Sequence, residues 1–175
     1  MKSIQSRQIT RSIVGAASVV LTVALSGCKA IVTDRYEATA TTTYTWHVYY
    51  ADNPDRKRER VEEFASASLV NRNGLKPEQP ASYQDDQGLW WPPIPPRPTV
   101  EEIEAHQQRG ETPSDPEIHT SVDYQITYEL GDRQVSKPTN YQVYRQVAKR
   151  YPEQPPLEFT LSPNESSVEK AEPFQ

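Results

Sequence analysis

Residues 36–50 read YEATATTTYTWHVYY and decide the fold of the region around them. The even positions carry the aromatic and small apolar side chains, including Tyr44, Trp46 and Tyr50, whereas the odd positions are mostly Thr. Strict alternation with Thr and aromatic enrichment is typical of a β-strand. Because the large side chains gather in the later half, we predict that residues 42–50 form the well-paired part and that the earlier half is tether.

Two later segments show the same alternation. Residues 121–130 read SVDYQITYEL, and Gly131-Asp132 then turns the chain into residues 133–136 as a hairpin partner. Residues 157–161 read LEFTL between two prolines and predict a short last strand.

Three segments predict helices. Residues 55–70 place Val61, Phe64 and Leu69 at helical spacing, between Asn53-Pro54 as the start and Asn73-Gly74 as the end. Residues 100–109 follow Thr99, which forms a capping box with a Glu at the third helical position. Residues 139–151 place their aromatic and apolar side chains on one helical face, although Tyr141 and Val143 also suit a strand.

The segment 75–98 is rich in proline. Residues 77–98 contain seven Pro, which enforce an extended polyproline II backbone and exclude both a helix and a central strand. Trp90, Trp91 and Ile94 either pack back onto the sheet, making the segment a structural strap, or are displayed as a ligand for an aromatic groove. We favour the strap, because two adjacent exposed Trp side chains promote aggregation.

The order of these elements predicts an α+β fold with a small, mostly antiparallel sheet and two or three short helices. Residues 36–161 form a single domain interrupted by the proline-rich segment 75–98. Residues 28–35 are expected to be a tether, and the polar residues 162–175 a disordered tail.

Charge and cysteine content exclude several classes of function. Among the 175 residues, 24 acidic side chains outnumber 19 Lys and Arg, so the formal net charge is −5. An acidic chain lacks the basic surface that nucleic-acid binding requires. A single cysteine excludes disulfides within the chain and thiolate metal clusters.

The N-terminus carries a leader pattern. Residues 1–12 contain three basic and no acidic side chains, and the apolar run 13–25 follows. Its 13 residues match a signal peptide and fall short of the about 20 that span a bilayer. Leu25, Ser26 and Gly27 then lead directly into Cys28. An ordinary cleaved signal peptide with a free thiol and an uncleaved anchor are the alternative interpretations.

Residues 1–28 resemble a bacterial lipoprotein precursor. The resemblance implies that 1–27 is a signal peptide, that Leu25, Ser26 and Gly27 form the lipobox, and that Cys28 carries a diacylglyceryl group and usually an N-acyl chain such as palmitate. It also implies anchoring at the extracytoplasmic face of a bacterial membrane. Removing three basic residues with the leader changes the net charge from −5 to −8. Anionic headgroups repel such a domain, which should stand off the bilayer.

Signatures of chemistry are lacking in the sequence. It contains no phosphate-binding glycine loop and no nucleophile elbow. His47, His106 and His119 fall on a strand, a helix and a loop, and we expect neither a metal site nor an organic cofactor.

Three functions remain open at this point. The first is a non-catalytic, lipid-anchored accessory or scaffold protein that binds an unidentified protein partner through Trp90, Trp91, Ile94 and the row Tyr44, Trp46 and Tyr50. The second is a cell-wall or glycan-binding module that uses this aromatic row. The third, and least favoured, is an unrecognised enzyme. The first two differ in whether the aromatic row is buried or lies flat and exposed.

Overall fold

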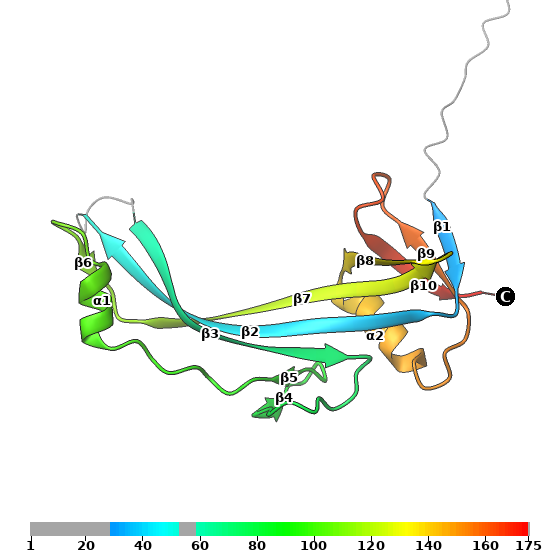
Figure 1. Cartoon of the computed structure of the whole chain (residues 1–175), viewed down its shortest axis with the longest axis horizontal. Coiled ribbons are helices and arrows are strands. Elements are labelled where there is room, and N and C mark those ends of the chain that lie inside the picture. Colours follow the sequence, from blue (N-terminus) through cyan, green and yellow to red (C-terminus); the bar gives the residue numbers. More distant parts are fainter. Residues whose placement is uncertain (1–28, 53–58, 175) are drawn as a thin grey trace, which may run out of the picture.

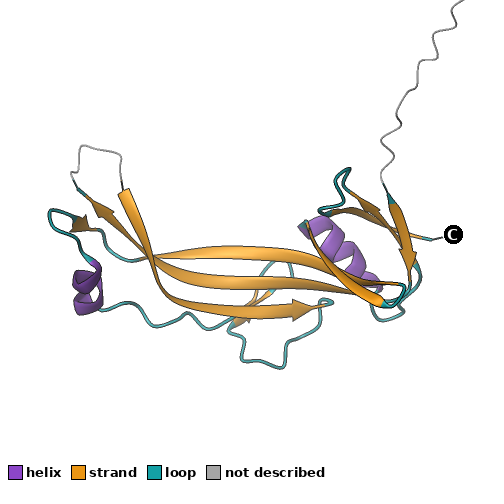
Figure 2. Cartoon of the chain, turned by 45° about the horizontal axis from the view of Figure 1, so that its top comes forward, coloured by secondary structure: helices purple, strands orange, loops and turns teal. Residues whose placement is uncertain are grey.

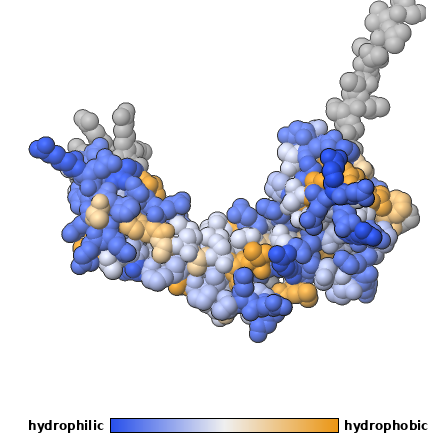
Figure 3. Space-filling model, in the orientation of Figure 1, coloured by the Kyte–Doolittle hydropathy of each residue, from blue (hydrophilic) through white to orange (hydrophobic). Residues whose placement is uncertain are grey.

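The computed structural model describes residues 29–52 and 59–174 as an elongated molecule with two thick ends and a thinner waist (Figures 1 and 3). The strands are β1 (Ala30–Thr33), β2 (Tyr36–Ala51), β3 (Glu59–Arg72), β4 (Tyr83–Gln84), β5 (Trp90–Trp91), β6 (Thr112–Pro113), β7 (Glu117–Leu130), β8 (Arg133–Thr139), β9 (Leu157–Leu161) and β10 (Val168–Pro173). The helices are α1 (Val100–His106) and α2 (Tyr141–Arg150).

A ribbon of three long antiparallel strands, β3, β2 and β7, connects the two ends. The central strand β2 pairs with β3 from Thr39 to Ala51 and with β7 from Tyr36 to His47. The predicted strand is therefore confirmed along its whole length. The predicted tether character of its first half is wrong, because the small side chains Ala38 and Ala40 are fully buried there.

The helix predicted over 55–70 is wrong. Its described part, 59–70, belongs to β3, and its proposed start lies outside the described residues. A β-bulge explains the error: Thr45 pairs with Ser66 and His47 with Glu63, so two residues of β3, Phe64 and Ala65, oppose one of β2. The extra residue shifts the alternation by one position, and the shifted alternation resembles helical spacing.

The base is the thick end that contains both ends of the described chain. It comprises α2, the sheet β1-β9-β10 and the ends of β2, β7 and β8 (Figure 1). Phe159 of β9 is fully buried between Tyr36 and Tyr128, with ring centroids 5.8 and 5.7 Å away. The predicted α2, the hairpin β7-β8 and strand β9 are all confirmed here.

Two segments that we expected to be unstructured belong to the base. Residues 30–33, within the predicted tether 28–35, form β1, which pairs with β9 and buries Ile31. Residues 168–173, within the predicted disordered tail, form β10 on the other side of β9 and bury Val168 and Ala171. β1 has only four residues, too few to show an alternation, and β10 has only two apolar side chains that become buried, so neither segment predicts a strand without its partner β9.

The tip is the opposite end, formed by α1, β6 and the far ends of β2 and β3 (Figure 1). Thr99 caps α1, and both hydrogen bonds of the predicted capping box with Glu102 are present. The helix buries Ile103, and the hydroxyl of Tyr50 donates to the carbonyl oxygen of that residue at 2.8 Å. Among the described residues, the tip core contains three buried apolar residues: Val48, Tyr50 and Ile103.

The expected α+β class is wrong. Strands make up 51% of the described residues and helices 12%, in three sheets with two helices (Figure 2). The fold is therefore β-rich. Two errors account for the difference, namely the bulged β3 taken as a helix and the strands β1 and β10 taken as unstructured.

The signal peptide, the lipobox and Cys28 lie outside the described residues. Within 29–52 and 59–174, neither helix has the length and apolarity needed to cross a membrane.

Candidate functional site

The strap is the segment of residues 90–98. It crosses the even face of the ribbon, which is the face that carries the even-numbered residues of the later half of β2. It begins with β5, beneath the middle of the molecule, and runs to the start of α1 at the tip (Figure 1). The strap lies on the face of β2 that carries Thr42, Tyr44 and Trp46. The strap thus covers this face of the waist and connects the waist to the tip.

Backbone and side-chain hydrogen bonds fix the start of the strap. The carbonyl oxygen of Trp90 accepts from the Thr42 hydroxyl at 2.8 Å and from the Asn71 side-chain amide at 3.0 Å. The Trp90 N–H donates to the Asn71 side-chain oxygen at 2.7 Å. Thr42 and Asn71 are buried, so these bonds satisfy polar groups that would otherwise destabilise the ribbon.

Trp91 is the apolar anchor of the strap. It is 7% exposed, and its ring lies 5.0 Å from that of Tyr44. Its indole N–H donates to Asp85 at 2.8 Å. Burial and the hydrogen-bonded hydroxyl of Tyr83 raise the pKa of Tyr44 to about 12, so this hydroxyl stays protonated. Trp90 is only half-buried, with the ammonium group of Lys76 5.4 Å from its ring.

The later part of the strap alternates between contact and exposure with a period of three. Pro92, Pro95 and Pro98 are buried, whereas the two residues that follow each of them are exposed. The indole N–H of Trp46 donates to the carbonyl oxygen of Pro95 at 2.9 Å. Ile94, in contrast, is 60% exposed. The segment is therefore attached along one edge only.

The predicted aromatic row is not an exposed flat surface. Tyr44 and Tyr50 are 6% and 1% exposed, and Trp46 is half-buried under the strap. The row forms the floor on which the strap and α1 pack. Of the six residues predicted to bind a partner, Ile94 is the one that the fold leaves most exposed, followed by the half-buried Trp90 and Trp46.

The opposite, odd face of the ribbon carries a cluster that the sequence did not predict. The rings of His47 and His119 stack with centroids 4.1 Å apart and 16° between their planes. The Tyr49 hydroxyl lies 2.9 Å from Nε2 of His119, and Glu63 lies 3.7 Å from Nε2 of His47. The prediction of His119 on a loop is wrong, because β7 begins at Glu117, four residues before the predicted start of the strand. The pairing of Thr45 with His119 brings the two rings together.

His106 lies apart from this pair, in an ion-pair network at the tip. Arg60 donates to both carboxylate oxygens of Glu111, at 3.0 and 2.6 Å, and to the carbonyl oxygen of His106 at 2.9 Å. The Arg60 hydrogen bond holds the pKa of the Glu111 carboxyl below its usual value. Arg60 also lies 4.4 Å above the ring of Tyr50 and pairs with Glu62. The network joins β3 to the loop after α1.

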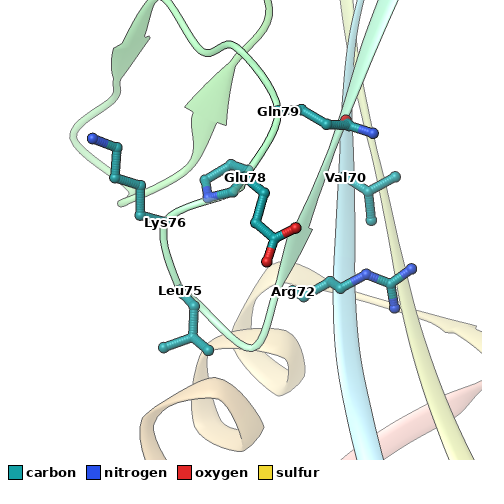
Figure 4. A pocket seen from close by; sticks show the side chains of 7 residues that line it. Val70, Arg72, Leu75, Lys76, Glu78 and Gln79 are labelled. Carbon is teal, nitrogen blue, oxygen red and sulfur yellow. The ribbon is translucent and has the colours of Figure 1, made fainter.

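The surface grooves do not converge on one ligand chemistry. One, of about 410 Å³, lies between the end of β3 and the loop that follows it (Figure 4). Arg72, Lys76 and Glu78 line it, so charges of both signs meet there. Another, of about 560 Å³, lies beside α1 at the tip, where Pro98, Val100 and Pro113 contribute an apolar wall.

Across the described ranges, no three His, Cys, Asp or Glu side chains gather as a metal site would require. Comparisons of the chain with protein-family models, with curated proteins and with solved structures found no match.

Proposed function

We propose that this chain is a lipid-anchored, non-catalytic accessory or scaffold protein at the extracytoplasmic face of a bacterial membrane. In this proposal Cys28 carries the lipid, and the strap and the tip contact a protein partner.

The observation that carries the proposal is that the long molecule has residue 29 at one end and the tip at the other. Lys29, the residue after the proposed lipidation site, lies in the base, where its carbonyl oxygen accepts from the N–H of Leu161 at 2.9 Å. From the base, β2 runs 16 residues to the tip, which at about 3.3 Å per residue is about 50 Å. An anchor at residue 28 would thus leave the strap and the tip far from the attachment point.

Electrostatics favours a molecule that projects from the bilayer. Without the leader the chain has a formal net charge of −8, and anionic headgroups repel such a surface. Two or three acyl chains bind stably at about 0.8 kcal/mol per buried methylene, so the anchor needs no help from surface contacts. In this proposal the lipid attaches the molecule to the membrane, and the length of the ribbon sets the distance between the membrane and the tip.

We do not extend the proposal to glycan binding. That alternative required an aromatic row open to a sugar, and Tyr44 and Tyr50 are buried beneath the strap and α1.

Metabolic labelling with a fatty acid tests the anchor. We expect the full chain to incorporate the label in its bacterial host and the Cys28→Ser variant to lose it. Ser18→Ala, a change within the apolar run, serves as the matched control and should keep the label. Equal labelling of Cys28→Ser and the parent would overturn the proposal.

A further inference from the structure

We propose that the exposed edges of the strap form a preordered polyproline II ligand, which docks through Pro93, Ile94, Pro96 and Arg97 into an aromatic, acidic-rimmed groove of a partner protein. The inference rests on the proposed function and names the class of partner that the anchored molecule would bind.

The backbone of the strap is dictated by its sequence. Residues 92–98 read PPIPPRP, so five of the seven have φ fixed near −65°. Ile94 and Arg97 each precede a proline, which disfavours the helical region for them as well. A polyproline II helix with three residues per turn is the conformation that remains.

The burial pattern has the period of that helix. The buried residues Pro92, Pro95 and Pro98 are three apart and form one edge, held on the ribbon by the bond from Trp46 to Pro95. The other two edges face outward and carry Pro93 with Pro96, and Ile94 with Arg97. One edge thus holds the strap in place while two edges remain open to a partner.

The attachment of the strap to the ribbon reduces the entropic cost of binding a partner. A free proline-rich peptide must lose the conformational freedom of its ends and side chains when it binds. The strap has already lost that freedom, because Trp91 fixes one end and the Thr99 cap of α1 fixes the other. The displayed edge is therefore organised before a partner arrives.

The residues on the edge define the partner's chemistry. Prolines and a branched apolar side chain at this spacing fit grooves lined by aromatic rings. Arg97 is the only charged residue of the strap, and its guanidinium lies 5.9 Å from the ring of Trp46, exposed to solvent. An acidic side chain at the rim of the partner's groove would pair with it and set the direction of docking.

Site-specific photo-crosslinking in isolated membranes of the host tests the proposal on the full chain. A photoreactive amino acid is placed at position 94 or 97 of the strap, or at the exposed position 121 on the opposite face as a control. The competing probe is a synthetic peptide of residues 90–98, and its matched control carries Ile94→Asp and Arg97→Glu.

We expect adducts to one protein from positions 94 and 97 and none from position 121. The peptide of residues 90–98 should lower their yield at least tenfold and the control peptide less than twofold. Sequencing of the adduct should place the crosslink beside Tyr, Trp or Phe residues of the partner. The absence of adducts, adducts insensitive to the peptide, an equal yield from position 121, or a crosslink on a surface without aromatic residues would each overturn the proposal.

The outcome is separable from that of the anchor. Loss of label in Cys28→Ser together with absent adducts would leave the lipid-anchored function standing and remove the strap as its binding element. Unchanged label would remove the anchor whatever the crosslinks show.

Discussion

The base and the tip of this molecule are each stabilised by different interactions. Fifteen buried apolar residues form the core of the base, from Ile31 in β1 to Ala171 in β10. The described part of the tip buries three, and it also relies on the hydrogen bonds that Arg60 donates to Glu111 and to the backbone of α1. Burial of apolar surface stabilises by about 25 cal/mol per Å², whereas much of the attraction in a partly buried ion pair such as Arg60–Glu111 is offset by the cost of desolvating its charges.

The difference assigns different tasks to the two ends. A base with a large apolar core depends little on salt, which suits the end at which we propose the anchor. A tip with a small core opens at a lower free energy, as regions with few buried contacts do. The strap joins them, because Trp91 packs at the waist and Thr99 begins the helix of the tip.

The largest effect is expected from the base. Phe159→Ala removes a fully buried ring that contacts Tyr36 and Tyr128, and such truncations cost about 3–5 kcal/mol. We expect denaturant unfolding of the chain beginning at residue 29 to shift to much lower denaturant, with both ends unfolding together. A shift below about 1 kcal/mol would mean that the base core is not what holds the molecule together.

A smaller effect is expected at the strap. Trp91→Ala should cost about 3 kcal/mol, because it creates a cavity beside Tyr44 and frees the start of the strap. Trp90→Ala is the matched control, since that ring is half-buried, and it should cost less than half as much. Thermal melting of the two variants measures the difference. Equal losses would show that the strap is not anchored through Trp91.

A third change should affect the tip alone. Glu111→Gln removes the charge that pairs with Arg60, and we expect faster amide hydrogen exchange in α1 and β6 with little change in α2 and β9. The pKa of the Glu111 carboxyl is lowered in the folded chain. Its contribution to stability is therefore complete above the ordinary carboxyl pKa of 4.5 and is lost as the pH falls through the lower folded value.

This pH dependence provides the control for the tip. The parent should show increased exchange in α1 as the pH falls below about 4.5, and Glu111→Gln should show none of that increase. Exchange that rises equally in the base of both proteins would remove the distinction between the two ends.

The smallest effect is expected from the exposed edge of the strap. Ile94→Asp changes a side chain that is 60% exposed, so its effect on the melting free energy should stay within about 0.5 kcal/mol. The same variant should lose the crosslinked partner. A large loss of stability would place Ile94 in the packing of the strap and not on its outer edge.

The sequence predicted the elements whose signals are local. The alternation in β2 and β7, the Thr99 capping box and the prolines of the strap each act within a few residues, and the structure contains all of them. It did not predict β3, because the bulge at Phe64 and Ala65 interrupts the alternation of apolar and polar side chains along the strand. It also missed β1 and β10, which become strands only by pairing with β9, more than 120 residues from β1 and a few from β10.

The candidate site divides in the same way. Proline spacing predicted an extended strap, and its seven-residue PPIPPRP core already contains the period of three. Which edge faces the ribbon could not be derived, because it depends on the hydrogen bond from Trp46 to Pro95 across about fifty residues of chain. The stacked pair His47 and His119 likewise depends on the register of β2 with β7.

The central claim is that the molecule is anchored at its base and holds the tip and the strap away from the membrane. Fluorescence quenching tests it most directly, with the full, processed protein in vesicles whose lipid headgroups carry a nitroxide. A fluorescent amino acid is placed at position 170 in β10, two strands and about 10 Å from β1, or at position 101 in α1. We predict strong quenching at position 170 and little at position 101. Quenching at position 101 as strong as at position 170 would contradict the account.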